Sequence, residues 1–128
     1  GEAEEGPALG MHTDAGIMLA ALRGWGVGVD GAFTVVLRDG KVHKVPVASH
    51  DVVVVAGEGS QWLPGLRWRP CPHALELSPG QSRTWMGTMV LPEPSFHVAP
   101  GVEFGTWWER TGAALSAGNH SAVEGLGC

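Results

Sequence analysis

Hydrophobic residues along this chain occur in short runs that are separated by glycine, proline and Asp-Gly pairs. The clearest run is Val52-Val53-Val54-Val55, whose β-branched residues predict a buried strand over residues 51–56. Residues 33–37 predict another strand, and residues 41–47 a third one that Pro46 limits to a sheet edge or a strand end. Short strands between frequent turn signals are typical of an all-β sandwich or jelly roll.

A β-hairpin is predicted in the middle of the chain. Its first strand begins at residues 67–69 and continues through His73, and the Ser-Pro-Gly-Gln sequence at residues 78–81 then forms a turn. Residues 82–91 are the return strand. We therefore expect a hairpin that carries His73 on one arm and Arg83 on the other.

The remaining segments give weaker patterns. Residues 17–22 fit a buried strand, although their Met, Ala and Leu side chains also suit a short helix. Asp30-Gly31 predicts a turn, and so does Gly57-Glu58-Gly59, where we interpret Glu58 as a turn residue rather than a catalytic acid. Residues 106–115 are expected to form a C-terminal helix, followed by an irregular glycine-rich end.

Composition agrees with one small β-rich domain. The chain has 128 residues, with 20 glycines, 9 prolines and no tyrosine. That length suits one hydrophobic core. Cys71 and Cys128 do not make a disulfide framework, and Cys71 is expected to be a buried, inert thiol.

Charge and hydropathy limit the classes of partner. The net charge of −5 argues against a broad nucleic-acid interface, and the basic cluster Arg67-Trp68-Arg69 is too small to reverse that expectation. No apolar stretch approaches the ~20 residues of a membrane span, and no secretory signal opens the chain. These features favour a cytoplasmic location, and they leave a small molecule or a modified macromolecule as the expected class of substrate.

The most informative motif is His12-Thr13-Asp14, which is followed far downstream by His73 and then by Arg83. An H-x-D pair with one distant histidine is the ligand set of a 2-His-1-carboxylate triad, which holds Fe(II) on one face and leaves other positions open. Arg83 suits a carboxylate clamp, because a guanidinium group grips a carboxylate with two parallel hydrogen bonds.

The order and spacing of these motifs resemble the iron(II)/2-oxoglutarate-dependent dioxygenase superfamily, in particular the branch similar to isopenicillin N synthase. Members of that branch have an H-T-D-x-G motif, a V-x-N-x-G-D strand end, and a distal histidine followed by R-x-S. The resemblance covers residues 10–91. It implies a double-stranded β-helix in which 2-oxoglutarate is the co-substrate and Arg83 pairs with its far carboxylate. The Fe(II) ligands that it implies are His12, Asp14 and His73.

The chain departs from the family pattern after Arg83. Where the family has R-x-S, this sequence has Arg83-Thr84-Trp85, so Trp85 shares the strand face of Arg83 and Thr84 points to the other face. The strand-end asparagine is also missing. Iron binding is thus better supported than 2-oxoglutarate binding. Arg83 and Thr84 remain the candidate co-substrate residues, and the candidate pocket walls are Trp25, Trp62 and Trp85.

The predicted organisation has three parts. Residues 1–9 form a mobile acidic leader, residues 10–91 the β-helix core, and residues 92–128 an extension that packs on the barrel. Because the H-x-D motif comes so early, we interpret the chain as the C-terminal part of a catalytic domain, with the remainder of a larger chain as a possible partner.

Two other functions fit the same residues. One is a cupin-like metal-binding protein that uses the same barrel without oxygenase activity. The other is a truncated, non-catalytic jelly roll that acts as a binding module, in which the exposed strand edges must be covered.

Overall fold

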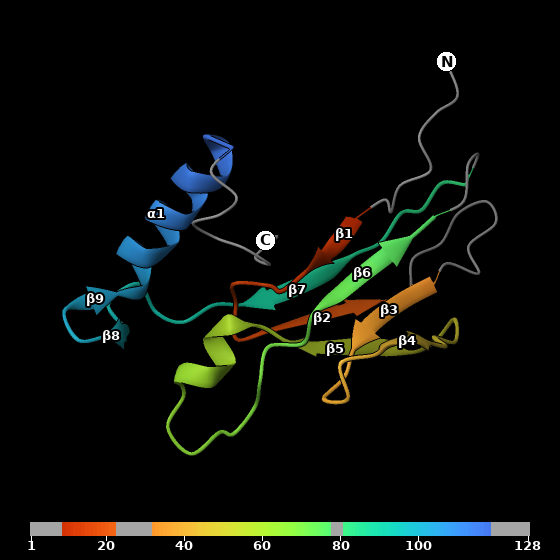
Figure 1. Ribbon diagram of the computed structural model, residues 1–128, viewed down its shortest axis with the longest axis horizontal. Helices are drawn as coiled ribbons and strands as arrows, with labels where there is room; N and C mark the ends of the chain where they lie inside the picture. Colours follow the sequence, from red (N-terminus) through yellow and green to blue (C-terminus); the bar gives the residue numbers. More distant parts are fainter. Residues whose placement is uncertain (1–8, 23–31, 78–80, 119–128) are drawn as a thin grey trace.

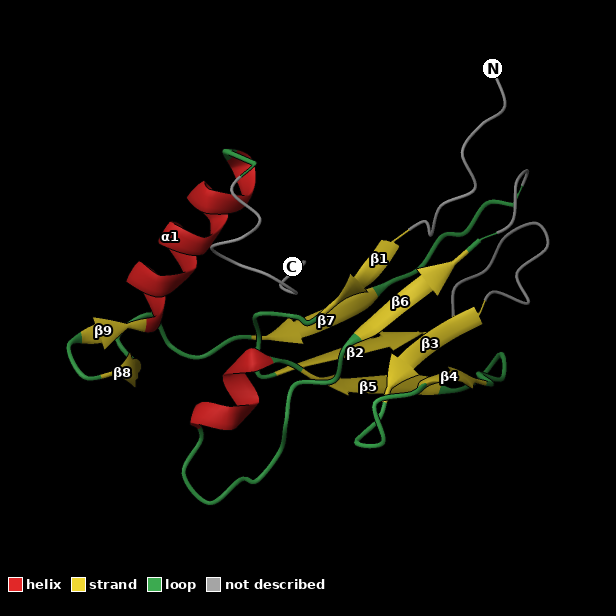
Figure 2. Ribbon diagram, in the orientation of Figure 1, coloured by secondary structure: helices red, strands yellow, loops and turns green. Residues whose placement is uncertain are grey.

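The structure is a computed structural model that describes residues 9–22, 32–77 and 81–118. These residues form two antiparallel β-sheets, a small β-hairpin, a 3-10 helix and one α-helix (Figures 1 and 2). The first sheet contains β1 (Leu9–His12), β6 (His73–Glu76), β3 (Ala32–Val36) and β4 (Val42–Val45), in that order. The second contains β5 (Val52–Ala56), β2 (Met18–Leu22) and β7 (Gly87–Val90), in that order.

The C-terminal elements lie beside the two sheets (Figure 1). They are the hairpin of β8 (His97–Ala99) and β9 (Val102–Glu103), and the helix α1 (Phe104–Ser116). The 3-10 helix η1 (Glu58–Trp62) follows β5 and contacts α1 through Trp62, whose ring centre is 4.9 Å from that of Trp107. No helix among the described residues is long and apolar enough to cross a membrane.

Alternation of side chains places one face of each sheet toward the other sheet. In β5 the side chains of Val53 and Val55 line a cavity between the sheets, whereas Val52 and Val54 are 55% and 61% exposed. The run of four valines predicts a strand buried on both faces, and this expectation is wrong. The inner face of β5 faces the first sheet across the cavity, whereas its outer face is exposed.

The predicted hairpin of residues 67–91 is also wrong. β6 pairs with β1 and β3 in the first sheet, whereas β7 pairs with β2 in the second. The strand is shorter than expected as well, because residues 66–72 have no regular structure before β6. The chain therefore crosses from one sheet to the other between Glu76, the end of β6, and Gly87, the start of β7. Residues 78–80, where most of the turn was expected, lie outside the described residues, and so do residues 24–31.

Other elements agree more closely with the pattern. Residues 18–22 form a strand rather than a helix, the strands predicted at 33–37 and 41–47 are present as β3 and β4, and α1 extends the expected helix by a few residues. The β8–β9 hairpin was not predicted. Its turn contains Gly101, whose φ of 72° is a conformation that favours glycine.

Candidate metal centre

The three predicted metal ligands come together at the first sheet. His12 is the last residue of β1 and His73 the first residue of β6, and the two residues are paired directly across these antiparallel strands. Their ring centres are 4.4 Å apart. Asp14 follows β1 in a loop, and its Oδ1 lies 3.5 Å from His12 Nε2 and 3.6 Å from His73 Nε2.

Both histidines are oriented by hydrogen bonds to the backbone. His12 Nδ1 lies 2.7 Å from the carbonyl oxygen of Gly10, and His73 Nδ1 lies 3.0 Å from that of Cys71. A carbonyl oxygen can only accept, so each Nδ1 carries the hydrogen and donates it. In the neutral ring, Nε2 then holds the lone pair that a metal needs, and both Nε2 atoms face Asp14.

Asp14 is the strongest indication of a cation. Its side chain is fully buried, and neither carboxylate oxygen has a hydrogen-bond partner among the described residues. An uncompensated buried carboxylate is costly, and buried charges in proteins are normally paired or bound to a metal. His12 and His73 are also buried, at 6% and 4% exposure. The three side chains therefore form an enclosed anionic site.

The separations fit one bound ion. One ligand atom from each residue lies within 4.8 Å of the others. Two ligand atoms that each lie about 2.1 Å from one metal would be about 3.0 Å apart at a right angle and about 3.4 Å apart at a tetrahedral angle. The Nε2–Oδ1 distances of 3.5 and 3.6 Å therefore need only small side-chain rotations. This group could bind a divalent metal.

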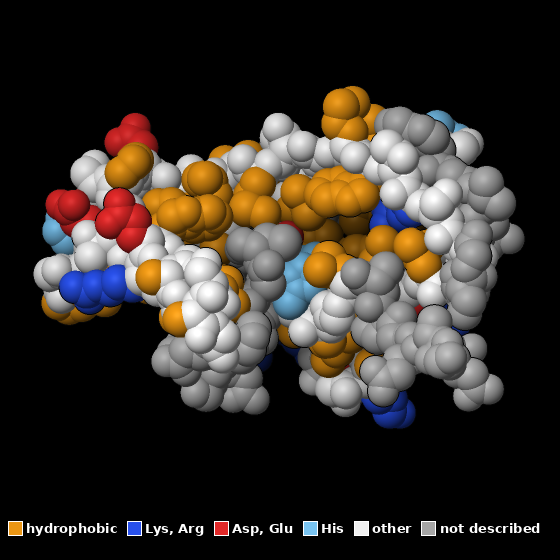
Figure 3. Space-filling view, turned by 90° about the horizontal axis from the view of Figure 1, so that it is seen from above, with side chains coloured by type: hydrophobic (Ala, Val, Ile, Leu, Met, Phe, Trp, Pro, Cys, Tyr) orange, Lys and Arg blue, Asp and Glu red, His pale blue; other side chains and the backbone are white. Residues whose placement is uncertain are grey.

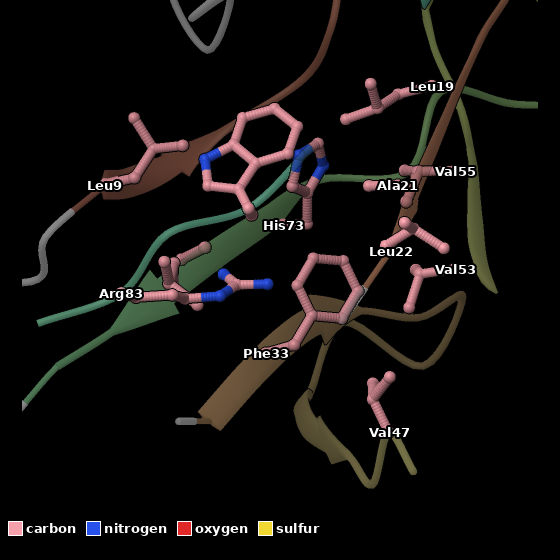
Figure 4. A pocket seen from close by; sticks show the side chains of 13 residues that line it. Leu9, Leu19, Ala21, Leu22, Phe33, Val47, Val53, Val55, His73 and Arg83 are labelled. Carbon is pink, nitrogen blue, oxygen red and sulfur yellow. The ribbon is translucent and has the colours of Figure 1, made fainter. Parts of the chain in front are cut away.

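A cavity of about 70 Å³, partly open to solvent, adjoins His73 between the two sheets. Its lining is mainly hydrophobic, and it includes Phe33, whose ring lies 5.6 Å from that of His73. Arg83 is the one cationic side chain among the described lining residues, and its guanidinium group points into the cavity toward Phe33 and His73 (Figure 4). The space-filling view shows the hollow with histidine and basic surface inside a hydrophobic rim (Figure 3).

The other predicted site residues have different positions. Trp85 lines the cavity together with Arg83, whereas Thr84 is exposed and is not among its lining residues. Trp62 does not line this cavity either. It packs against Phe104 and Trp107 instead. Trp25 lies outside the described residues.

Comparison with known proteins finds no matching family model, no matching curated protein and no matching solved structure. The assignment of this centre therefore depends on the geometry of its own residues.

Sequence analysis missed the residues that surround the ligands. The carboxylate of Glu58 accepts a hydrogen bond from the hydroxyl of Thr13, which lies between two of the metal-site residues. Cys71 contributes its carbonyl oxygen to His73, and burial raises the pKa of its thiol, which favours the protonated form. The Thr13–Glu58 contact has no local sequence signal, because it joins segments 45 positions apart, whereas Cys71 lies only two residues before His73.

Proposed function

We propose that this protein is a non-haem Fe(II) oxygenase that uses a 2-oxo acid and dioxygen to oxidise an organic substrate. The observation that carries the proposal is the convergence of His12, His73 and the carboxylate of Asp14, which has no hydrogen-bond partner among the described residues, in one buried group. Two imidazoles and one carboxylate are the protein ligands of non-haem Fe(II) oxygenases. The proposed fold is a double-stranded β-helix, which the two facing antiparallel sheets support.

Each residue has a separate task in this proposal. His12, Asp14 and His73 bind Fe(II), and the backbone carbonyls of Gly10 and Cys71 hold the two imidazole rings in the binding tautomer. Arg83 binds the far carboxylate of the 2-oxo acid. The hydrophobic cavity walls exclude bulk water, which limits side reactions near the metal.

The bound Fe(II) would supply the oxidation chemistry. In the overall reaction, 2-oxoglutarate loses carbon dioxide and becomes succinate, which takes up one atom of dioxygen. The other oxygen atom is inserted into a C–H bond of the substrate as a hydroxyl group. The protein contributes binding, orientation and shielding to this reaction.

The test is the formation of succinate from 2-oxoglutarate by the purified protein with and without Fe(II). We expect Fe(II)-dependent turnover that His12→Ala and Asp14→Ala abolish. His43→Ala is the matched control, because His43 is an exposed histidine outside the centre that pairs with Asp39, and it should retain turnover. Turnover that survives both His12→Ala and Asp14→Ala would refute the proposal.

A second candidate is a cupin-like metal protein that binds a small apolar ligand without oxidising it. The hydrophobic lining of the cavity favours it, because Trp85 stands where the resembling family has a hydroxyl beside the arginine. The same assay separates the candidates when it also includes 4-methyl-2-oxopentanoate, a 2-oxo acid with an apolar chain. Bound iron without consumption of either acid would favour this second function.

A further inference from the structure

The start of η1 contacts the loop that carries Asp14. β1 ends at His12 and Thr13 forms an isolated β-bridge, so Asp14 lies in the loop just beyond this pairing. Three backbone hydrogen bonds hold the loop of residues 14–17 against residues 57–59. The amide groups of Gly57, Glu58 and Gly59 donate to the carbonyl oxygens of Ile17, Asp14 and Gly16 at 3.0, 2.7 and 2.9 Å, respectively.

The backbone of residues 57–59 lies so close to the loop that carries Asp14 that Gly57 and Gly59 must be glycine. A Cβ atom on Gly57 would lie 2.6 Å from the carbonyl oxygen of Asp14, and one on Gly59 would lie 2.9 Å from the carbonyl carbon of Gly16. Contacts that short force the backbone to move. Glycine at both positions therefore lets the main chain of residues 57–59 lie directly against the metal-site loop.

Glu58 adds a side-chain contact to the same loop. Thr13 Oγ1 donates to Glu58 Oε1 at 2.7 Å, and the amide of Gln61 donates to Glu58 Oε2 at 2.6 Å. Thr13 lies between the two ligands His12 and Asp14. Because neighbouring side chains on extended backbone point in opposite directions, its hydroxyl is directed away from the side on which the ligands meet.

We propose that Glu58 is a positioning residue for the metal centre, acting through the hydroxyl of Thr13. It sets the orientation of the peptide units between His12 and Asp14, and so the spacing of the two ligand atoms. This inference rests on the metal site of the proposed function, which it deepens. Groups that orient metal ligands typically change metal affinity by about 10- to 100-fold when they are removed.

The experiment measures the Kd for Co(II) and the visible absorption spectrum of the bound Co(II), using the full chain. Thr13→Val, which keeps the shape of threonine without its hydroxyl, should weaken Co(II) binding by about 10-fold or more and change the spectrum. Glu58→Ala should do the same, and combining the two changes should add little, because both remove one interaction.

Three further variants separate positioning from general damage. Thr13→Ser restores the hydroxyl and Glu58→Gln keeps an oxygen that can accept its hydrogen, so both should bind Co(II) nearly as the unmodified chain does. Gln61→Ala, which removes only the outer and exposed contact to Glu58, should have little effect. Should Glu58→Ala fail to fold, Thr13→Val and Thr13→Ser decide the question.

Unchanged Co(II) affinity and spectrum in a folded Thr13→Val variant would overturn the positioning role and leave the proposed function intact. Failure of the unmodified chain to bind Co(II) would instead overturn the metal centre itself, and this inference with it.

Discussion

At the scale of single residues, the metal centre combines a carboxylate that receives no hydrogen bond from any described residue with two imidazole rings whose Nε2 lone pairs face that carboxylate. Asp14 has a fully buried side chain, and neither of its oxygens has a hydrogen-bond partner within the described ranges. Such a group destabilises the metal-free protein, and a bound cation would reverse that cost. Metal binding and folding stability should therefore be linked through this residue.

Replacing Asp14 with asparagine should separate the stabilisation by bound metal from the cost of the buried carboxylate in the metal-free protein. We expect a divalent metal at about 100 times its Kd to stabilise the unmodified protein by about 2.7 kcal/mol, and Asp14→Asn to lose this increase. Without metal, Asp14→Asn should be at least as stable as the unmodified chain, because it removes a buried charge. Thermal unfolding with and without Co(II) measures both effects. An equal metal-dependent rise in Tm in the variant would contradict this account.

Arg83 should determine acid binding rather than metal binding. Arg83→Lys keeps the charge but loses the two-pronged geometry, so we expect the Kd for 2-oxoglutarate to rise about 10-fold or more, as for a lost charge-assisted hydrogen bond. The Co(II) affinity should not change. Quenching of tryptophan fluorescence follows acid binding, because Trp85 lines the same cavity. If Arg83→Lys bound 2-oxoglutarate as tightly as the unmodified chain, Arg83 would not be the residue that binds the far carboxylate.

At the scale of elements, the sequence predicted strands better than their partners. Hydrophobic runs locate β3, β4 and β5 because alternation and β-branching are local properties. Pairing is not local. The approach of β7 to β2 rather than β6 depends on contacts between segments far apart in the chain, and for this reason the predicted hairpin was wrong.

Two glycines should respond in opposite ways to alanine. Gly40 has a φ of 73° in the turn between β3 and β4, so Gly40→Ala should lower the free energy of unfolding by about 1–2 kcal/mol. Gly112 is exposed within α1, and a Cβ atom there meets nothing within 4 Å. Gly112→Ala should therefore stabilise the protein by up to about 1 kcal/mol. Denaturant unfolding compares them, and destabilisation by both changes would be inconsistent with the described backbone.

The contribution of the β3–β4 turn to folding stability should depend on pH, because Asp39 lies in it. The backbone amide of Lys41, which donates to Asp39 Oδ1 at 2.9 Å, lowers the pKa of Asp39 below its ordinary value of 3.8, and His43 contributes in the same direction. Because the folded state binds the proton less readily than the unfolded state, ionised Asp39 stabilises the fold above about pH 4. This stabilisation is lost as the pH falls through the lower pKa of the folded state.

Asp39→Asn should therefore be slightly less stable than the unmodified protein at pH 7. The gap in Tm should narrow as the pH falls from about 4 through the lower pKa of Asp39 in the folded state. Thermal unfolding across this range tests the prediction, and a gap that stays constant or widens in acid would contradict it.

At the scale of the whole molecule, an aromatic cluster joins α1 to η1, the 3-10 helix that follows β5. Trp62 at the end of η1 contacts Phe104 and Trp107 of α1, with ring centres 6.2 and 4.9 Å apart, and Phe104 is only 4% exposed. The cluster uses a tryptophan that the sequence favoured as a pocket wall. Its position could not be predicted, because a tryptophan in a short run suits both a core and a pocket.

Trp62→Ala should lower the free energy of unfolding by about 2–3 kcal/mol, somewhat less than for a fully buried tryptophan, because Trp62 is half-buried. Its Co(II) affinity should stay unchanged, since the cluster does not contact the ligands. Trp68→Ala is the control, because Trp68 is 47% exposed, and it should have a small effect. If Trp62→Ala bound Co(II) as weakly as Thr13→Val does, the aromatic cluster would also position the metal ligands, and this prediction would be wrong.

The metal ligands themselves could be predicted because the H-x-D motif is short and its distal histidine is separated by a recognisable interval. The structure brings those three residues together. The support from Glu58 could not be predicted, since it joins residues 45 positions apart. The identity of the metal, the use of 2-oxoglutarate, the domain boundaries and a cytoplasmic location remain predictions.

The most direct test of the central claim is an anomalous difference map at the iron edge, from crystals grown with Fe(II) without oxygen. The account predicts one peak about 2.0–2.2 Å from Nε2 of His12, Nε2 of His73 and a carboxylate oxygen of Asp14. The absence of a peak at these three residues, or a peak held by other side chains, would contradict it.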